Sequence, residues 1–253
     1  RKEKNYNDPI VASHIGVTGI PYNQLNERIV GKAVEEGEKI GVLLSKVRGI
    51  GNGPRRNRTE FNPWTINLFD EEIREILDSD GLIGINLDQR ILGFTSRVAE
   101  WVSKPSKEYF QKQEFLELFG EDVPIIGGRL EEDLDLLEES ALVAKEEAII
   151  NRRQHTRYLV NNILHIVKIG GEKAWKHICI GSDFDGLIDP INSCKSTLQF
   201  KTLEKRLYKT ITEMSQEALK EDNSIDFYIN DLKAQIRDLM YENGKRFLSK
   251  NFN

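Results

Sequence analysis

The stretch ICIGSDFDG, residues 178–186, decides how the rest of the chain is interpreted. A short apolar run ends in glycine, serine and two aspartates, which is the pattern of a buried strand that delivers carboxylates to the edge of a sheet. Three interpretations are open. The stretch can be a strand of a metal-dependent hydrolase barrel, an aspartate loop for phosphoryl transfer, or a purely structural turn, because Asp and Gly are also common turn residues.

The length and composition are those of one ordinary domain spanning residues 1–253. A chain of 253 residues fits a single large domain, since α/β barrels of about 250 residues are common. With 39% hydrophobic and 30% charged residues, neither wholesale disorder nor a membrane protein is indicated. No apolar run approaches the roughly 20 residues that a bilayer span requires, and residues 1–8 lack the apolar core of a secretion signal. The compartment stays undetermined.

The net charge and the number of cysteines limit which partners and which cysteine-based sites we expect. A net charge of -5 argues against general affinity for the phosphate backbone of nucleic acid. The two cysteines, Cys179 and Cys194, are too few for a disulfide framework or a closed cysteine zinc site. We therefore expect neither a nucleic-acid partner nor a membrane span.

Two further apolar runs end in polar residues. Residues 8–14, DPIVASH, predict a turn and a short strand that ends on His14, and residues 82–87, LIGINL, predict a second strand that leads into Asp88-Gln89-Arg90. A helix before the second strand, capped by Asn67 or Asp70 and ended by Gly81, completes the βαβ rhythm of a parallel sheet. The carboxyl ends of such strands are where α/β sheets place ligands.

The segment between the first two strands is harder to interpret. Residues 24–47 contain apolar residues at helical spacing but also Gly31, Gly37 and Gly41, and we expect a helix there. Residues 49–58, GIGNGPRRNR, form a basic loop that lacks the Gly-Lys-Ser/Thr of a nucleotide-binding P-loop. Its arginines either form a solvated surface or present guanidinium groups to a carboxylate or phosphate; they are Arg55, Arg56 and Arg58. We predict that residues 20–63 are an insertion or lid.

The rest of the chain predicts mainly helices. Residues 131–151 and 151–169 are expected to be helical, with a strand from Trp175 to Ile180 after them. Two amphipathic helices follow Pro190, and their apolar stripes are expected to cover the sheet. For His155 and His165, which lie in the helical stretches, packing or surface roles are favoured over metal binding.

Taken together, the three strand ends resemble the last three strands of the membrane dipeptidase (renal dipeptidase-like) family of the amidohydrolase superfamily, whose members are zinc-dependent (β/α) barrels. The most specific match is GSDFDG at 181–186, supported by PIVASH at 9–14 and LHIV at 164–167. The segment DQRILG at 88–93 is similar to bacterial amidohydrolase-like proteins. The resemblance implies an α/β fold that is the C-terminal part, about the last three βα units, of a (β/α)8 TIM-type barrel with extra helices.

The resemblance also implies a chemistry. His14 would be a ligand to one of two zinc ions, and Asp183 would handle the proton of the metal-bound water. Two close cations lower the pKa of that water and polarise the scissile carbonyl of a peptide or amide substrate. Asp183 would then move the proton to the leaving amine. Asp88 and Arg90, with the three arginines of the basic loop, are the candidate substrate-binding residues.

The chain departs from the family pattern in two respects. It contains no His-x-Asp and no His-x-His, so His14 is the only zinc ligand that the resemblance supplies. We expect the missing N-terminal half of the barrel, or a partner chain such as a second copy in a homo-oligomer, to supply the rest, and the isolated chain to be inactive. In addition, Ile66 stands where dipeptidases place an Arg that holds the substrate's terminal carboxylate, and one of the loop arginines could replace it.

Two alternatives stay open. Asp-x-Asp-Gly after an apolar strand also resembles the first motif of haloacid dehalogenase-type phosphatases, with Asp183 as nucleophile, Asp185 as acid/base and Mg²⁺ as cofactor. Leu187 stands where a Thr is usual in that motif. The second alternative is a non-catalytic assembly fragment, because three strands cannot close a barrel and their open edges favour association.

Overall fold

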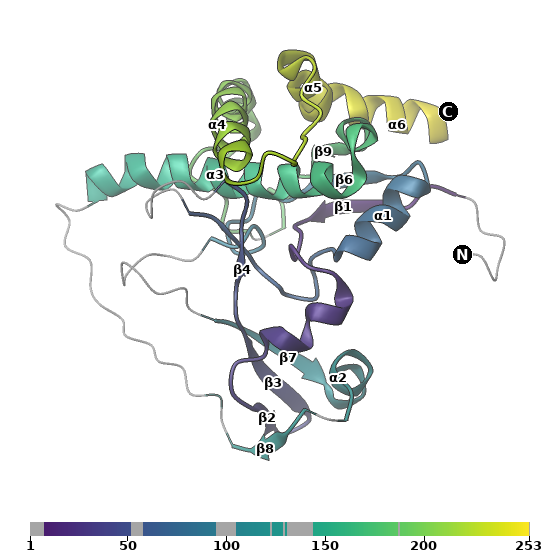
Figure 1. Cartoon of the computed structure of the whole chain (residues 1–253), viewed down its shortest axis with the longest axis vertical. Coiled ribbons are helices and arrows are strands. Elements are labelled where there is room, and N and C mark those ends of the chain that lie inside the picture. Colours follow the sequence, from purple (N-terminus) through teal and green to yellow (C-terminus); the bar gives the residue numbers. More distant parts are fainter. Residues whose placement is uncertain are drawn as a thin grey trace.

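The computed structural model describes residues 8–51, 58–94, 105–121, 123–128, 130, 144–186 and 188–252, with only the backbone of 144–152. The chain is a mixed α/β structure (Figure 1). Helices surround a three-stranded sheet, and a separate four-stranded sheet lies on the other side of it from α4, α5 and α6. Among the described residues, no helix is both long and apolar enough to cross a membrane.

The three-stranded sheet contains the strands that end in polar residues. Its order is β1 (Val11–Ile15), β6 (Leu82–Ile85) and β9 (Ile178–Ile180), and both neighbouring pairs are parallel, as predicted. All four residues of β6 are buried, which suits a central strand covered on both faces. The three carboxyl ends consequently meet at one edge of the sheet.

Helices cover this sheet and form most of the core. The helix α1 (Asp70–Asp78) precedes β6, and α3 (Ala144–Gly170) precedes β9 through the 3-10 helix Glu172–Lys176. Beyond α3 lie α4 (Phe200–Glu221), preceded by the 3-10 turn Thr197–Gln199, and then α5 (Leu232–Arg237), the π-helix Asp238–Glu242 and α6 (Asn243–Asn251). The expected amphipathic helices after Pro190 are therefore present.

A fully buried arginine ties α3 to α4. The Nη2 of Arg157 donates to the carboxylate of Glu217 at 2.5 Å and to the carbonyl of Gly51 at 2.8 Å. Because a buried charge needs a hydrogen-bonded partner, this ion pair fixes how the two helices and the Gly51 turn meet.

The helix expected at residues 24–47 is wrong. Two 3-10 turns, Tyr22–Gln24 and Asn26–Arg28, lead into an antiparallel hairpin of β2 (Ala33–Glu36) and β3 (Lys39–Leu44). Two local features permit the hairpin: Gly37 has φ +65°, which lets the chain turn tightly, and the side chains of Ile40, Val42 and Leu44 are buried on one face of the strand. The alternating strand period outweighs the apparent helical spacing.

The hairpin belongs to the four-stranded sheet, whose order is β7-β3-β2-β8. The strands β7 (Ser106–Gln111) and β8 (Ile125–Gly127) flank α2 (Lys112–Phe119), and the short pair β4 (Val47–Arg48) and β5 (Glu60–Phe61) leads back toward α1. Since this sheet combines strands from inside and outside residues 20–63, the assignment of that segment as an insertion or lid stays a prediction.

The expected cap of α1 is also wrong. The residue before the helix is Phe69, whose N–H donates to Glu72, while the Asn67 amide oxygen accepts from the N–H of Gly16. Asp70 is the first helical residue, and its carboxylate lies 2.7 Å from Nε2 of His165 in the interior. His165 therefore has the packing role expected of it.

One expected helix is described only in part, and one strand end differs from expectation. Residues 131–143 of the expected acidic helix lie outside the described residues, and the described part of the helix is α3, Ala144–Gly170. The strand β9 begins at Ile178 rather than Trp175, because a 3-10 helix occupies Glu172–Lys176.

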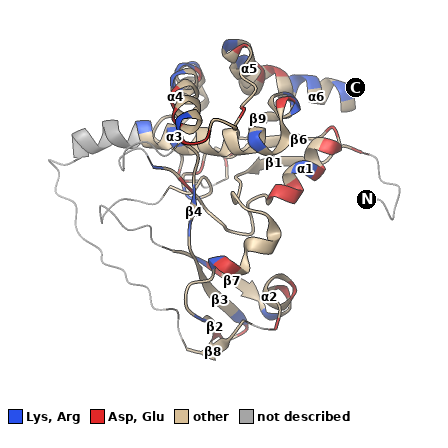
Figure 2. Ribbon diagram, viewed as in Figure 1, with Lys and Arg blue, Asp and Glu red and all other residues tan. Residues whose placement is uncertain are grey.

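The first turn of α1 is acidic. Carboxylates gather in the first turn of α1, which is red in Figure 2, and Lys and Arg are frequent along α4 and α6. Negative charge near a helix amino end interacts favourably with the helix dipole. The acidic first turn thereby helps to fix the start of α1 beside β1.

The ends of the parallel strands are brought together by a close backbone contact. The register of β1 against β6 shifts between Ala12 and Ile15, and the Ser13 carbonyl lies against Gly84 in β6 and Gly181 after β9. A Cβ at either glycine would lie closer to that oxygen than real Cβ atoms do. Both positions therefore require glycine for steric reasons.

We expect Gly84→Ala to lower the free energy of unfolding by ~1–3 kcal/mol, because the added methyl would push the Ser13 backbone away. Urea unfolding followed by circular dichroism measures this. The matched control is Gly244→Ala in α6, where a Cβ meets open space and helix propensity leaves stability unchanged or raises it by up to ~1 kcal/mol. Equal stabilities of the two variants would contradict the close contact.

Candidate active site at the carboxyl ends of the parallel strands

The carboxyl ends of β1, β6 and β9 surround a cavity of about 330 Å³. Its apolar wall consists of Ile15, Ile66, Ile91 and Ile188. Its main polar side chains are Ser13, His14, Asn86, Asp88, Arg90 and Asp183. The cavity therefore brings together all four site residues predicted at the strand ends.

His14 is exposed near the end of β1. Its Nδ1 lies 2.7 Å from the Oγ of Ser13. When Nδ1 carries the proton and donates to Ser13, Nε2 is left with a free lone pair, which is the form in which histidine binds a metal. Within the described part of the chain, Nε2 has no hydrogen-bond partner. His14 thus has the environment of an available ligand.

Asp183 adopts a left-handed backbone conformation, with φ 56°. The N–H of Gly186 donates to the Asp183 carbonyl at 2.9 Å, and a Cβ at position 186 would overlap the Asp183 carboxylate. Such conformations are uncommon outside glycine and often mark functional turns. The turn therefore aims the Asp183 carboxylate, and Gly186 leaves the room for it.

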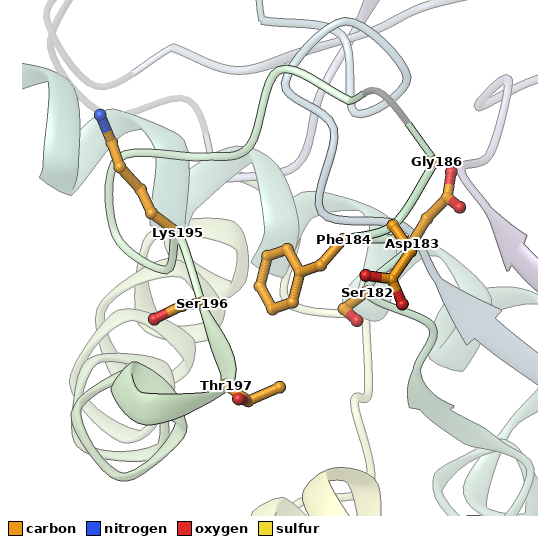
Figure 3. A pocket seen from close by; sticks show the side chains of 8 residues that line it. Ser182, Asp183, Phe184, Gly186, Lys195, Ser196 and Thr197 are labelled. Atoms are coloured by element: carbon orange, nitrogen blue, oxygen red, sulfur yellow. The ribbon is translucent and has the colours of Figure 1, made fainter.

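A second cavity of about 600 Å³ adjoins the Asp183 turn (Figure 3). It is lined by residues 182–186 and, across from Phe184, by residues 195–197 before α4. Asp183 lines both cavities, whereas Asp185 lines the second cavity and does not line the cavity that contains His14. Of the two aspartates of the motif, Asp183 is therefore the one beside His14.

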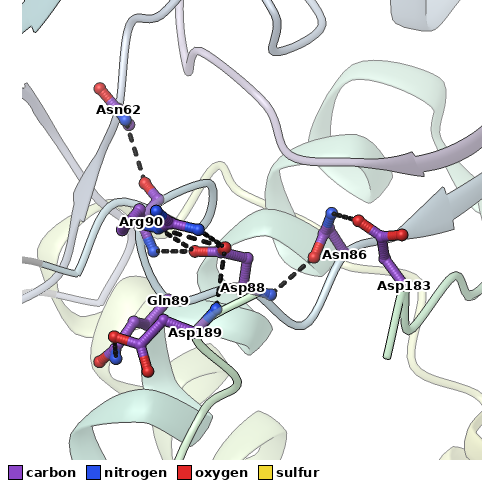
Figure 4. A network of polar contacts seen from close by, with 7 residues as sticks. All are labelled: Asn62, Asn86, Asp88, Gln89, Arg90, Asp183 and Asp189. Carbon is purple, nitrogen blue, oxygen red and sulfur yellow. Dashed lines mark hydrogen bonds and ion pairs between the residues drawn. The ribbon is translucent and has the colours of Figure 1, made fainter. Parts of the chain in front are cut away.

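A polar network connects Asp183 to the exit of β6 (Figure 4). The amide of Asn86 donates from Nδ2 to the Asp183 carboxylate at 3.4 Å, and its Oδ1 accepts from the N–H of Asp88 at 2.6 Å. Asp88 is 2% exposed. Its carboxylate accepts from the backbone N–H, Nε and Nη2 of Arg90 and from the N–H of Asp189.

These contacts determine the pKa of the Asp88 carboxyl group. Burial raises the pKa of a carboxyl group, but the hydrogen bonds and charge of Arg90, together with the Asp189 N–H, outweigh it, so the pKa of Asp88 lies below its usual value. Asp88 is therefore a buried carboxylate that holds Arg90 in place.

Two asparagines are site residues that sequence reasoning missed. Asn86 orients Asp183, and the buried Asn67 bonds to Gly16, to the Asn62 carbonyl and to the Ile91 carbonyl. The only signal for Asn86 was a polar residue inside the apolar run before Asp88. Its role depends on the pairing of β6 with β9, which brings Asp183 beside it.

The basic loop does not reach this cavity in the described part of the chain. Arg58 is exposed and does not line the cavity, and Arg55 and Arg56 lie outside the described residues. Ile66 lies in the cavity wall and is largely exposed. The role suggested for the three arginines stays a prediction.

Among the described histidines, His14 has a ring nitrogen available to a metal, and the described residues do not form a complete zinc site. His165 is paired with Asp70, Nδ1 of His177 lies 2.8 Å from the Gly81 carbonyl, and Nδ1 of His155 accepts from the N–H of Asn192. Among the described residues there is no group of three or more His, Cys, Asp or Glu side chains that could hold a metal. Zinc in proteins takes three or four protein ligands, so a zinc ion at His14 needs further donors.

We expect Asp88→Asn to lower the free energy of unfolding by about 1.5–3 kcal/mol at neutral pH, because the charge-assisted bonds to Arg90 are lost. A carboxylate whose pKa falls on folding stabilises the protein above its unfolded pKa and loses that contribution as pH falls through its folded pKa. The difference between wild type and variant should therefore shrink below about pH 4.

Urea unfolding at a series of pH values measures this prediction. The control is Asp78→Asn, which removes an exposed partner of Lys173 and should change stability by less than ~1 kcal/mol. A loss in Asp88→Asn that is no larger than in Asp78→Asn, or that does not depend on pH, would contradict the buried ion pair.

Comparison with known proteins found a match to one family. The model of one family, membrane dipeptidase (peptidase family M19), matches residues 57–225, about two thirds of the chain. The match includes β6, β9 and the Asp183 turn, while His14 lies before it. Searches of curated proteins and of solved structures gave no match. Because the family match covers more than half of the chain, this protein belongs to the membrane dipeptidase family, peptidase family M19.

Proposed function

We propose that this protein acts as a zinc-dependent hydrolase that cleaves a peptide or amide bond in a small, dipeptide-like substrate. The observation that carries the proposal is the meeting of His14 and Asp183 in one cavity at the carboxyl ends of parallel strands. Membership of the membrane dipeptidase family supports the same class of reaction. This edge of the sheet is where α/β folds place their catalytic groups.

The chain's own residues have distinct roles in this proposal. A pair of zinc ions, when bound, would supply an acidified water and polarise the scissile carbonyl. His14 would hold one ion through Nε2, with Ser13 fixing the imidazole. Asp183 accepts the proton of the attacking water and passes it to the leaving amine, and Asn86 keeps its carboxylate turned toward the cavity.

We also propose that the three parallel strands are part of a (β/α)8 barrel whose other strands complete the metal site. The missing ligands would come from sequence upstream of Arg1 or from a partner chain, which includes the case of a homo-oligomer. Support comes from β1, which pairs only with β6 among the described strands and exposes 47% of Val11. An edge strand of this kind is suited to receive another strand.

Two alternative functions have less support than the zinc-dependent hydrolase. The family match includes Asp183 and Asp185, so the Asp-x-Asp-Gly motif is accounted for without a haloacid dehalogenase-type phosphatase. A non-catalytic assembly fragment is favoured by the same open edge of β1, and it is the outcome if the completed protein proves inactive.

The proposal is tested on two forms, the present chain and the protein encoded by its complete reading frame. We expect the complete form to hydrolyse dipeptides when loaded with zinc, and the present chain alone to show no such activity. His14→Ala and Asp183→Asn in the complete form should each lower kcat/KM by ~10²–10⁴-fold, since each removes a ligand or a proton-transfer group.

The control for these variants is His177→Gln, because His177 lies at the opposite ends of the strands, beside Gly81, and should leave kcat/KM unchanged. Zinc content is measured in parallel with turnover. A complete form that holds zinc but hydrolyses no dipeptide, or full activity after His14→Ala, would contradict the proposed function. Activity of the present chain with stoichiometric zinc would contradict an incomplete site.

A further inference from the structure

One edge of the Arg90 guanidinium group is hydrogen-bonded to Asp88, and the other edge has no partner in the described part of the chain. Its Nε donates to both carboxylate oxygens of Asp88, at 3.0 and 3.2 Å, and Nη2 donates to Oδ2 at 2.5 Å. A guanidinium group carries five N–H donors in a rigid plane. In the described part of the chain, Nη1 has no hydrogen-bond partner, and 57% of the Arg90 side chain is exposed.

The guanidinium is therefore fixed before a ligand arrives. Asp88 is buried and also accepts from the N–H of Asp189, so it cannot move with Arg90 toward solvent. The Arg90 carbonyl accepts from the amide of Asn62, which fixes the backbone as well. A donor held in this way loses little conformational freedom on binding, which favours affinity.

The residues around Arg90 favour a ligand with a single negative charge. Among the described residues, Arg90 is the only Lys or Arg that lines this cavity, and its neighbours there include the carboxylate of Asp183 and the apolar side chains of Ile66 and Ile91. Asp183 would repel a doubly charged phosphate more strongly than a singly charged carboxylate. A cation opposite apolar walls suits a small molecule with one carboxylate and an apolar body.

We propose that Arg90 binds the carboxylate of the substrate through its free Nη1 edge, with Asp88 as the positioning residue. The inference rests on the proposed function, since it takes the ligand of this cavity to be the hydrolase substrate. It takes the ligand to be the free carboxylate of the dipeptide-like substrate already proposed, and it places the receptor for that carboxylate on the loop after β6. Ile66, in the same wall, contacts the apolar part of the ligand.

The test compares two probes that differ in one charge: the dipeptide Ala-Ala and its C-terminal amide. Binding to the full chain is measured by calorimetry and by chemical-shift changes of the Arg90 Nε–H. We expect the acid to bind about 10- to 100-fold more tightly than the amide, as for one charge-assisted hydrogen-bonded contact. Arg90→Met should remove this preference, and Arg90→Lys should retain part of it.

Two further variants separate recognition from folding. Arg246→Met removes another half-exposed arginine that is paired with a carboxylate, Asp238, far from the cavity, and should keep the full preference for the acid. Asp88→Asn should reduce the preference for the acid, because the charge that holds Arg90 in place is removed. Inorganic phosphate should compete weakly with Ala-Ala.

The outcomes distinguish this inference from the proposed function. Equal affinities for acid and amide in the wild type, no binding of the acid at millimolar concentration, or an unchanged preference in Arg90→Met would each overturn it. If Arg58→Met removes the preference in place of Arg90→Met, the basic loop is the receptor and the inference is wrong. A preference for the acid that depends on Arg90, in a complete protein that hydrolyses nothing, would keep the binding site and discard the hydrolase.

Discussion

The pairing of β6 with β1 on one side and with β9 on the other is the constraint on which the site depends. His14 and Asp183 are separated by most of the chain, and only the parallel order β1-β6-β9 places their strand ends beside one another. The order is held by the close approach of the Ser13 carbonyl to Gly84 and Gly181, which leaves no room for a side chain at either glycine. A short sheet with such contacts can fix catalytic groups because the backbone, rather than a flexible side chain, sets their spacing.

The second constraint is the polar network that crosses the strand ends. It runs from Arg90 through Asp88 and Asn86 to Asp183, and its central members are buried. In a low-dielectric interior such a network stabilises a structure only when its members find partners, and here each bond also orients the next residue. The same contacts therefore serve stability, the orientation of Asp183 and the presentation of Arg90 to the cavity.

The sequence predicted the parts of the fold that depend on local pattern and missed those that depend on distant contacts. Apolar runs that end in polar residues correctly predicted the three parallel strands and the convergence of His14 and Asp183. The helix expected at residues 24–47 failed because glycines and short apolar runs fit both periods, and the choice is made by pairing with β7 and β8. The role of Asn86 could not be predicted, because its partner Asp183 is 97 residues away.

The location of bound zinc is the measurement that tests the central claim most directly. Crystals of the protein soaked with zinc, with diffraction recorded at the zinc absorption edge, would show where the metal binds. We predict an anomalous peak beside Nε2 of His14, on the side of the cavity that Asp183 faces. Zinc bound only at His177 or at surface carboxylates, with no peak at His14, would contradict a metallohydrolase site at the carboxyl ends of these strands.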